Sequence, residues 1–370
     1  MSSNNQSAVV SERLVSLDAL RGFDMFWIIG GDLLFKALAK GTGNGFLNSL
    51  TIQFDHVKWE GFRFEDIIMP LFLFIVGVAM PYSFNKRIER GQTRREILWH
   101  VIKRVVILWV LGTIAQGNLL KYDLSQLHLY SNTLQAIAAG YFIASIIMLN
   151  LNLIWQVVST IGLLLVFWVL MMWVPVPGHG AGVLTPEGNL AIYIDKLILG
   201  PFYDGTPYTW ILSSPTFGAT VMLGVLAGYM LRSEKKESEK FLYLFATGIT
   251  LVVAGEIWAI WFPIIKHIWT SSFVLYSGGL SYLLLAIFYL IIDVWELRKW
   301  AFWLVVIGTN AIAVYMAYHV FDFKLVGNIF VGGLMKYLGN WGAFAQEAAA
   351  FAVVWLILYW MYRKKSFIKI

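Results

Sequence analysis

One apolar run decides the fold: residues 65–84 read EDIIMPLFLFIVGVAMPYSF. After its first two residues the run carries no charge, and about 20 mostly apolar residues let a helix cross a hydrocarbon core. Similar runs recur along the whole chain, at 17–38, 65–84, 98–116, 132–150, 153–174, 215–231, 241–262, 270–292, 301–321 and 342–361. We therefore predict an all-α, polytopic integral membrane bundle of about ten transmembrane helices.

The composition supports one membrane domain over residues 1–370. Hydrophobic residues make up 59% of the chain and charged residues 14%, whereas soluble domains carry about 25% charged residues. Seventeen Trp and seventeen Tyr suit aromatic belts at the two membrane surfaces. The absence of Cys removes disulfides and thiolate metal sites, and we expect no metal.

The Lys and Arg residues predict the orientation. Eighteen of the 28 fall in loops and tails on the side that both termini share under this span assignment, and nine fall on the other side. Basic residues accumulate on cytoplasmic loops, so both termini, including the segment 1–14, are predicted to be cytoplasmic. The extended loop 175–214 then faces outward. The net charge of +6 reflects this bias, and no nucleic-acid partner is expected.

Ionisable residues interrupt the first predicted span. On a continuous helix, Asp18, Arg21 and Asp32 share a stripe about 60° wide, and the 14 residues from Asp18 to Asp32 rise roughly 21 Å. Such a stripe, directed into the bundle, would line a path across the membrane. Asp18 and Arg21 could instead form an i,i+3 pair at the membrane surface.

A second polar group precedes the 65–84 run, where residues 55–61 read DHVKWEG. His56 is the side chain best able to exchange a proton near neutral pH, although a lone loop histidine is more often a solvated surface residue. Glu65 and Asp66 could equally be carboxylates that favour a helix N-terminus.

The 301–321 span carries Asn310 and His319. Nine residues place them 180° apart on a straight helix, so they share a cavity only if the helix bends. His319 with Tyr315, one turn earlier, is the more site-like pair.

Together these stretches resemble the heparan-α-glucosaminide N-acetyltransferase family. The resemblance rests first on three early stretches: residues 13–22, the His-x-x-Trp-x-Gly unit that starts at His56, and the run from Asp66 through Met69-Pro70 to Gly77. Later matches include Arg104, Asn310, His319 and the tail 362–370. It covers nearly the whole chain in order. It implies transfer of an acetyl group from cytosolic acetyl-CoA to the amine of a glucosamine-type acceptor on the far side of the membrane.

The resemblance also implies site residues. The family's active-site histidine falls on His56, as a general base or an acetyl relay, with Asp32 or Asp66 orienting it. The expected residues are His56, Asp32 and Asp66 for catalysis; Asn310, His319, Trp59 and Glu65 for the sugar or the oxyanion; and Arg104, Lys103, Arg21 and Asp18 for acetyl-CoA. A homodimer, contacts with membrane lipid and a bacterial inner membrane are further expectations.

Two departures and two alternatives remain open. Asp32 stands where the human family member has Asn, and Ser213-Ser214-Pro215-Thr216 stands where the family has Asp-Pro-Glu-Gly. An anion at Asp32 cannot donate hydrogen bonds, which changes what it could do in the site. An O-acetyltransferase acting on a glycan hydroxyl would need the same base, and a sugar transporter would also need a polar stripe.

Overall fold

The computed structural model describes residues 14–368, which fold into helices and connecting loops with no strand among them. The predicted N-terminal segment 1–14 lies outside this part of the chain except for Leu14, and so do Lys369 and Ile370 of the tail. The α-helices are α1 (Val15–Phe26), α2 (Asp32–Thr42), α3 (Gly45–Leu50), α4 (Ile68–Glu89), α5 (Arg94–Ala115), α6 (Thr133–Asn150), α7 (Leu153–Trp173), α8 (Leu190–Leu199), α9 (Ser214–Arg232), α10 (Glu237–Ala259), α11 (Ser271–Tyr289), α12 (Phe302–Gly308), α13 (Ala311–Val320), α14 (Phe323–Leu338) and α15 (Gly342–Arg363).

Most of the predicted spans are confirmed. Within residues 14–368, eight helical segments are long and apolar enough to cross a membrane, or up to nine if the bent pair α12 and α13 is one span. They contain α4, α5, α6, α7, α9, α10, α11 and α15. This makes the chain a multi-pass membrane protein.

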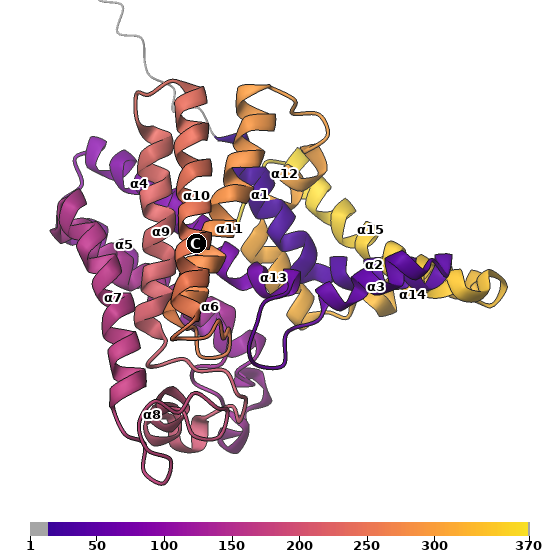
Figure 1. Cartoon of the computed structure of the whole chain (residues 1–370). Coiled ribbons are helices and arrows are strands. Elements are labelled where there is room, and N and C mark those ends of the chain that lie inside the picture. Colours follow the sequence, from indigo (N-terminus) through magenta and orange to yellow (C-terminus); the bar gives the residue numbers. More distant parts are fainter. Residues whose placement is uncertain (1–13, 369–370) are drawn as a thin grey trace, which may run out of the picture.

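The bundle has two ends with different loops (Figure 1). The α9–α10 connection lies at one end, which we call the basic end because its loops and helix termini include Arg232, Lys235 and Arg298. The helix α8 and the long stretch around it lie at the opposite end. There the Asp195 carboxylate accepts hydrogen bonds from the backbone N–H groups of Trp210 (2.7 Å) and Ile211 (3.0 Å), which ties α8 to the segment before α9.

The centre of the bundle is the close pair α4 and α9. A Cβ added at Gly77 of α4 would lie 2.0 Å from the carbonyl oxygen of Val221, and one at Gly224 of α9 would lie 2.0 Å from that of Phe74. Small residues at such crossings let two helix backbones approach each other directly, which is how membrane helices gain contact without a hydrophobic driving force. The helices α1 and α12 cross in the same way, through Gly22 and Gly308.

The first predicted span, 17–38, is wrong as a continuous helix. The helix α1 ends at Phe26, and the segment Trp27–Gly31 contains a kink at which Gly30 has φ +106° and Ile29 has φ −94°, ψ 22°. The chain then continues as α2, which leaves the bundle sideways (Figure 1). The angle counted from Asp18 to Asp32 assumed one straight helix, so the predicted stripe of polar residues does not form.

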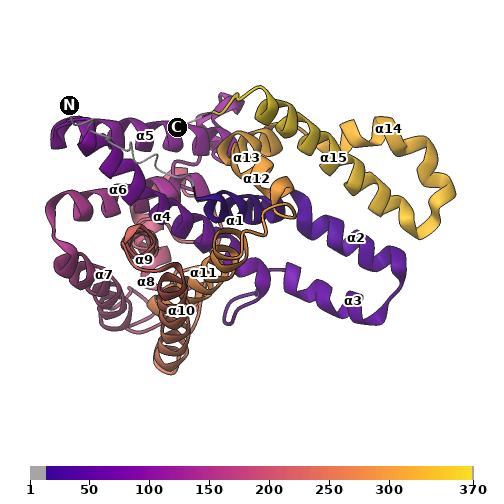
Figure 2. The same cartoon turned by 90° about the horizontal axis from the view of Figure 1, so that it is seen from above.

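Two further spans also differ from the prediction. The 301–321 segment is divided into α12 and α13, whose axes are bent by 72° at Thr309-Asn310. The stretch between the predicted spans 301–321 and 342–361 contains α14, and α14 packs along α15 as a hairpin. Together with α2 and α3, this hairpin forms a wing that extends to one side of the bundle in both views (Figures 1 and 2).

Candidate active site

A cavity of about 540 Å³ opens at the end opposite the basic loops. Six segments far apart in the sequence line it: the kink after α1, the stretch before α4, the loop between α5 and α6, the segment before α9, the α10–α11 connection and the end of α13. Its polar lining includes Asp32, His56, Glu65, Gln116, Asn132, Asp204, Tyr208, Lys266, Tyr315, Tyr318 and His319. Four of the predicted site residues, namely Asp32, His56, Glu65 and His319, therefore share one space.

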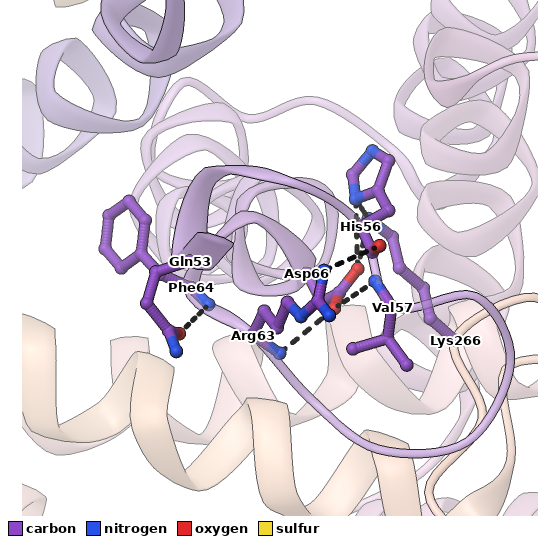
Figure 3. Close-up of polar contacts among 7 residues, drawn as sticks. All are labelled: Gln53, His56, Val57, Arg63, Phe64, Asp66 and Lys266. Carbon is purple, nitrogen blue, oxygen red and sulfur yellow. Dashed lines mark hydrogen bonds and ion pairs between the residues drawn. The ribbon is translucent and has the colours of Figure 1, made fainter. Parts of the chain in front are cut away.

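The imidazole of His56 is held between two charged side chains (Figure 3). Its Nδ1 lies 3.0 Å from Oδ1 of Asp66 and 3.2 Å from Nζ of Lys266. The Lys266 ammonium also lies 3.4 Å from the same Asp66 oxygen. The His56 side chain is 47% exposed, whereas those of Asp66 and Lys266 are buried behind it.

The backbone around His56 folds about the Asp66 carboxylate. Oδ2 of Asp66 accepts hydrogen bonds from the backbone N–H groups of Arg63 (3.0 Å) and Val57 (3.4 Å). The guanidinium of Arg63 donates to the carbonyl oxygen of His56 at 3.3 Å. Asp66 belongs to the 3₁₀ turn Phe64–Ile67 that leads into α4, so the rigid start of a buried helix fixes the loop that carries His56.

The sequence prediction missed Lys266, which it counted among the outward-facing lysines. Lys266 comes from the α10–α11 connection, and Gly61 N–H donates to the Ile264 carbonyl at 2.9 Å, which joins that connection to the His56 loop. Burial lowers the pKa of the Lys266 ammonium, and Asp66 and Glu65 oppose that effect. A usable signal was present, because the FPIIKHIW run at 262–269 places a charge in an otherwise apolar loop.

An ion-pair chain forms part of the cavity rim. The Lys36 ammonium of α2 lies 2.9 Å from Oδ1 of Asp55 and 3.5 Å from Oδ2 of Asp32. Asp55 precedes His56, so Lys36 links α2 to the loop that carries the histidine. Within residues 14–368, Asp32 makes no hydrogen bond to His56 or Asp66, and its ion-pair partner is Lys36.

Trp59 lies beside the cavity wall and not in its lining. Its ring stacks on that of His267, with centroids 5.1 Å apart, and its indole N–H donates to the Leu184 carbonyl at 2.9 Å. The ring of Tyr208 packs against that of His267, with centroids 4.4 Å apart. Burial, together with the neighbouring Lys266 cation, lowers the pKa of His267 to about 4.

The bend between α12 and α13 separates Asn310 from His319. Asn310 sits at the break, where its Oδ1 accepts a hydrogen bond from the Ile368 N–H at 3.0 Å, and it does not line the cavity. His319 lines the cavity with Tyr315, as the sequence suggested for this pair. Nδ1 of His319 lies 2.9 Å from the Tyr315 carbonyl oxygen, to which it donates, so Nε2 is the acceptor nitrogen of the neutral imidazole.

The four residues predicted for acetyl-CoA lie outside this cavity. Asp18 and Arg21 form an ion pair at 3.3 Å on α1. On α5 the Arg104 guanidinium lies over the ring of Tyr141 at 4.5 Å, and the Lys103 ammonium lies 5.5 Å from the ring centre of Trp99. Among residues 14–368, no three His, Asp or Glu side chains are grouped so that they could hold a metal ion.

Two curated mammalian proteins are similar to this chain. No protein-family model matches the chain. Curated proteins of mouse and human, each named heparan-α-glucosaminide N-acetyltransferase, are 26% identical to it over 379 residues and 25% identical over 382 residues. The alignments cover 86% of this chain and 56% of each relative, so the chain spans just over half the length of these proteins. The predicted relationship is thereby confirmed: this membrane protein is a relative of the heparan-α-glucosaminide N-acetyltransferases.

Proposed function

We propose that the chain transfers an acetyl group from acetyl-CoA to the amine of a glucosamine-type sugar in the cavity, with His56 as the reactive base. The observation that carries this proposal is the contact between His56 Nδ1 and Asp66 at the cavity wall. A histidine whose second nitrogen is held by a buried carboxylate is the arrangement that acyl-transfer enzymes use to fix the imidazole. The names of the two relatives support the acetyl group and the amino sugar.

The sugar ammonium first loses one proton to water, and the neutral amine that then attacks requires one further proton acceptor. The amine nitrogen attacks the thioester carbonyl, the N–C bond forms and the C–S bond breaks. The amine gives a proton to Nε2 of His56, which points away from Asp66 (Figure 3), and the leaving sulfur takes up a proton. A base of this kind contributes about 10²- to 10⁴-fold to the rate.

The charge of the cavity suits a cationic acceptor. Lys266 is paired with Asp66 and Lys36 with Asp32, which leaves Glu65 and Asp204, within residues 14–368, as the acidic side chains of the lining without an ion-pair partner. Carboxylates attract an ammonium group and repel phosphates. We therefore assign the amine to this cavity and the nucleotide of CoA to a site outside it.

Tyrosine hydroxyls of the lining are our candidate neutral donors for the oxyanion. Tyr208 and Tyr318 both line the cavity, and burial raises the pKa of Tyr208 to about 12, so that it keeps its proton at neutral pH. A neutral hydroxyl aimed at the developing charge stabilises the tetrahedral intermediate. His319, which presents an acceptor nitrogen, is assigned to a sugar hydroxyl.

The donor side is proposed from charge. We place the basic end in the cytoplasm, where acetyl-CoA is made. Arg104, Lys103, Arg21 and Asp18, on the two helices α1 and α5, are our candidates for contacts with the CoA nucleotide. A bacterial inner membrane and a homodimer remain part of this proposal.

The test is acetyl transfer by purified protein. Labelled acetyl-CoA and glucosamine are incubated with the wild type, with His56→Ala and with the control His179→Ala, an exposed loop histidine outside the cavity. We expect the rate to fall about 10²- to 10⁴-fold in His56→Ala and to stay at the wild-type level in the control. Unchanged transfer by His56→Ala would exclude His56 as the base.

The same assay separates direct transfer from an acetyl-histidine relay. Protein incubated with labelled acetyl-CoA in the absence of acceptor is digested, and the peptide containing His56 is examined by mass spectrometry. Acetylation of this peptide that glucosamine then removes indicates the relay. Label transferred only to a hydroxyl acceptor, such as N-acetylglucosamine, would instead indicate an O-acetyltransferase.

A further inference from the structure

The most informative contact of the site is one that the proposed reaction does not use. Nδ1 of His56, Oδ1 of Asp66 and Nζ of Lys266 form a triangle with sides of 3.0, 3.2 and 3.4 Å. A carboxylate and an ammonium thus approach the same imidazole nitrogen. That nitrogen can either donate to Asp66 or accept from Lys266, but it cannot do both.

The Asp66 distance decides which form is present. Oδ2 of Asp66 is occupied by two backbone N–H groups, which leaves Oδ1 as the acceptor that faces His56 and Lys266. A nitrogen lone pair 3.0 Å from a carboxylate oxygen would be repelled, so Nδ1 carries the proton and donates to Oδ1. The contact between Lys266 and His56 is then electrostatic and not a hydrogen bond.

The triangle is balanced only while His56 is neutral. With Asp66 ionised and Lys266 protonated, a neutral His56 leaves no net charge, whereas an imidazolium leaves one excess positive charge. The excess would lie next to two buried side chains, of which Lys266 is 6% and Asp66 1% exposed. A like charge this close disfavours the charged form of the imidazole, while Asp66 favours it.

We propose that Lys266 is a positioning residue that keeps His56 in its neutral, Nδ1-protonated form, so that Nε2 is available as the base. During the proposed transfer, Nε2 takes one proton from the attacking amine. The resulting imidazolium, 3.2 Å from the Lys266 ammonium, gives that proton to the sulfur as the C–S bond breaks. The catalytic part of this inference rests on the proposed function, but the protonation state of His56 does not.

In the described part of the chain, the other titratable groups near the triangle make no hydrogen bond to the His56 ring. Glu65 is a second carboxylate that favours the charged form of Lys266, and Tyr208 is a hydroxyl of the cavity lining. His267 follows Lys266 in the chain, and its pKa of about 4 leaves it uncharged at neutral pH. The Arg63 guanidinium contacts the carbonyl oxygen of His56 and not its ring. Lys266 is therefore the cation next to the imidazole within residues 14–368.

The test is the pH at which His56 becomes reactive. Only neutral histidine reacts with diethyl pyrocarbonate, so modification of the His56 peptide is followed by mass spectrometry from pH 5 to 9, without acetyl-CoA. In Lys266→Met the imidazole faces Asp66 alone, and we expect the half-reaction pH to rise by about one unit or more. Lys266→Arg, which keeps the cation, is expected to stay near the wild-type value.

The pH dependence of kcat/KM gives the catalytic readout. Its acidic limb should move upward in Lys266→Met by the same amount as the modification curve. The reciprocal variant Asp66→Asn, which leaves Lys266 unopposed, should move both curves downward, and it provides the test if Lys266→Met does not fold. Curves that stay in place in Lys266→Met, or that move equally in Lys266→Arg, would overturn the inference. Because modification needs no acetyl transfer, failure of the proposed function would leave this result readable.

Discussion

Asp24 is a buried carboxylate to which we assign no role in the proposed reaction. It lies on α1 with its side chain fully buried, and neither oxygen has a hydrogen-bond partner in the described part of the chain. A buried polar group without partners costs about 1–3 kcal/mol of stability. Asp195 is its natural comparison, because that carboxylate is equally buried but accepts two backbone N–H groups.

Replacing Asp24 is expected to stabilise the protein. Asp24→Leu removes the unpartnered carboxylate, so we expect a free energy of unfolding higher by about 1–3 kcal/mol and a higher Tm in detergent. Asp195→Leu, which leaves two N–H groups without an acceptor, should lower the Tm. A lower Tm in Asp24→Leu would show that the carboxylate is bound by a partner, such as ordered water, that stabilises it.

At the residue scale, the sequence predicted several residues that line the cavity but missed Lys266, which is buried behind His56. Asp32, His56 and Glu65 were identified because they are polar residues next to apolar spans, and such residues usually face a cavity. The position of Lys266 depends on a contact between segments 210 residues apart. The apolar run around Lys266 marks this lysine as unusual, but no local pattern reports which segment it contacts.

Among the elements, the crossing of α4 and α9 depends most directly on single residues. Gly77→Ala is expected to lower stability by about 1–3 kcal/mol, because its methyl group would meet the Val221 carbonyl and force the helices apart. Gly162→Ala in α7 is the control, since a Cβ there has no atom within 4 Å. Thermal unfolding in detergent measures both. Equal Tm values for the two variants would mean that the α4–α9 contact can relax at little cost.

Helix length was predictable, whereas helix continuity was not. The spans 65–84 and 153–174 match α4 and α7, because about 20 apolar residues suffice to identify a span. The average hydropathy of a segment does not reveal a break in its helix. The spans 17–38 and 301–321 are apolar on both sides of their breaks, so each was predicted as one helix. Gly30-Gly31 and Thr309-Asn310 were the local signs of these breaks. Glycine tolerates the positive φ found at Gly30.

For the whole molecule, the orientation in the membrane can be tested directly because the chain has no Cys. A single cysteine is introduced at Ser125, in the α5–α6 loop, or at Glu234, in the α9–α10 loop. If the basic end is cytoplasmic, a membrane-impermeant maleimide applied to intact cells should label Ser125→Cys and not Glu234→Cys. Labelling of both in permeabilised cells is the control. The reverse pattern in intact cells would invert the topology and move the cavity to the cytoplasmic side.

The bridge that Lys36 makes between α2 and Asp55 has a consequence for how the site responds to its surroundings. Asp55 is 59% exposed and Lys36 30% exposed, so dissolved ions reach this pair. At an ionic strength of 0.1 M, electrostatic screening acts over about 10 Å, and it weakens exposed pairs far more than buried ones. Salt should therefore weaken the exposed Lys36–Asp55 pair, which holds the loop that carries His56 on one side. It should leave the buried Asp66–Lys266 pair, which holds the same loop on the other side, nearly unchanged.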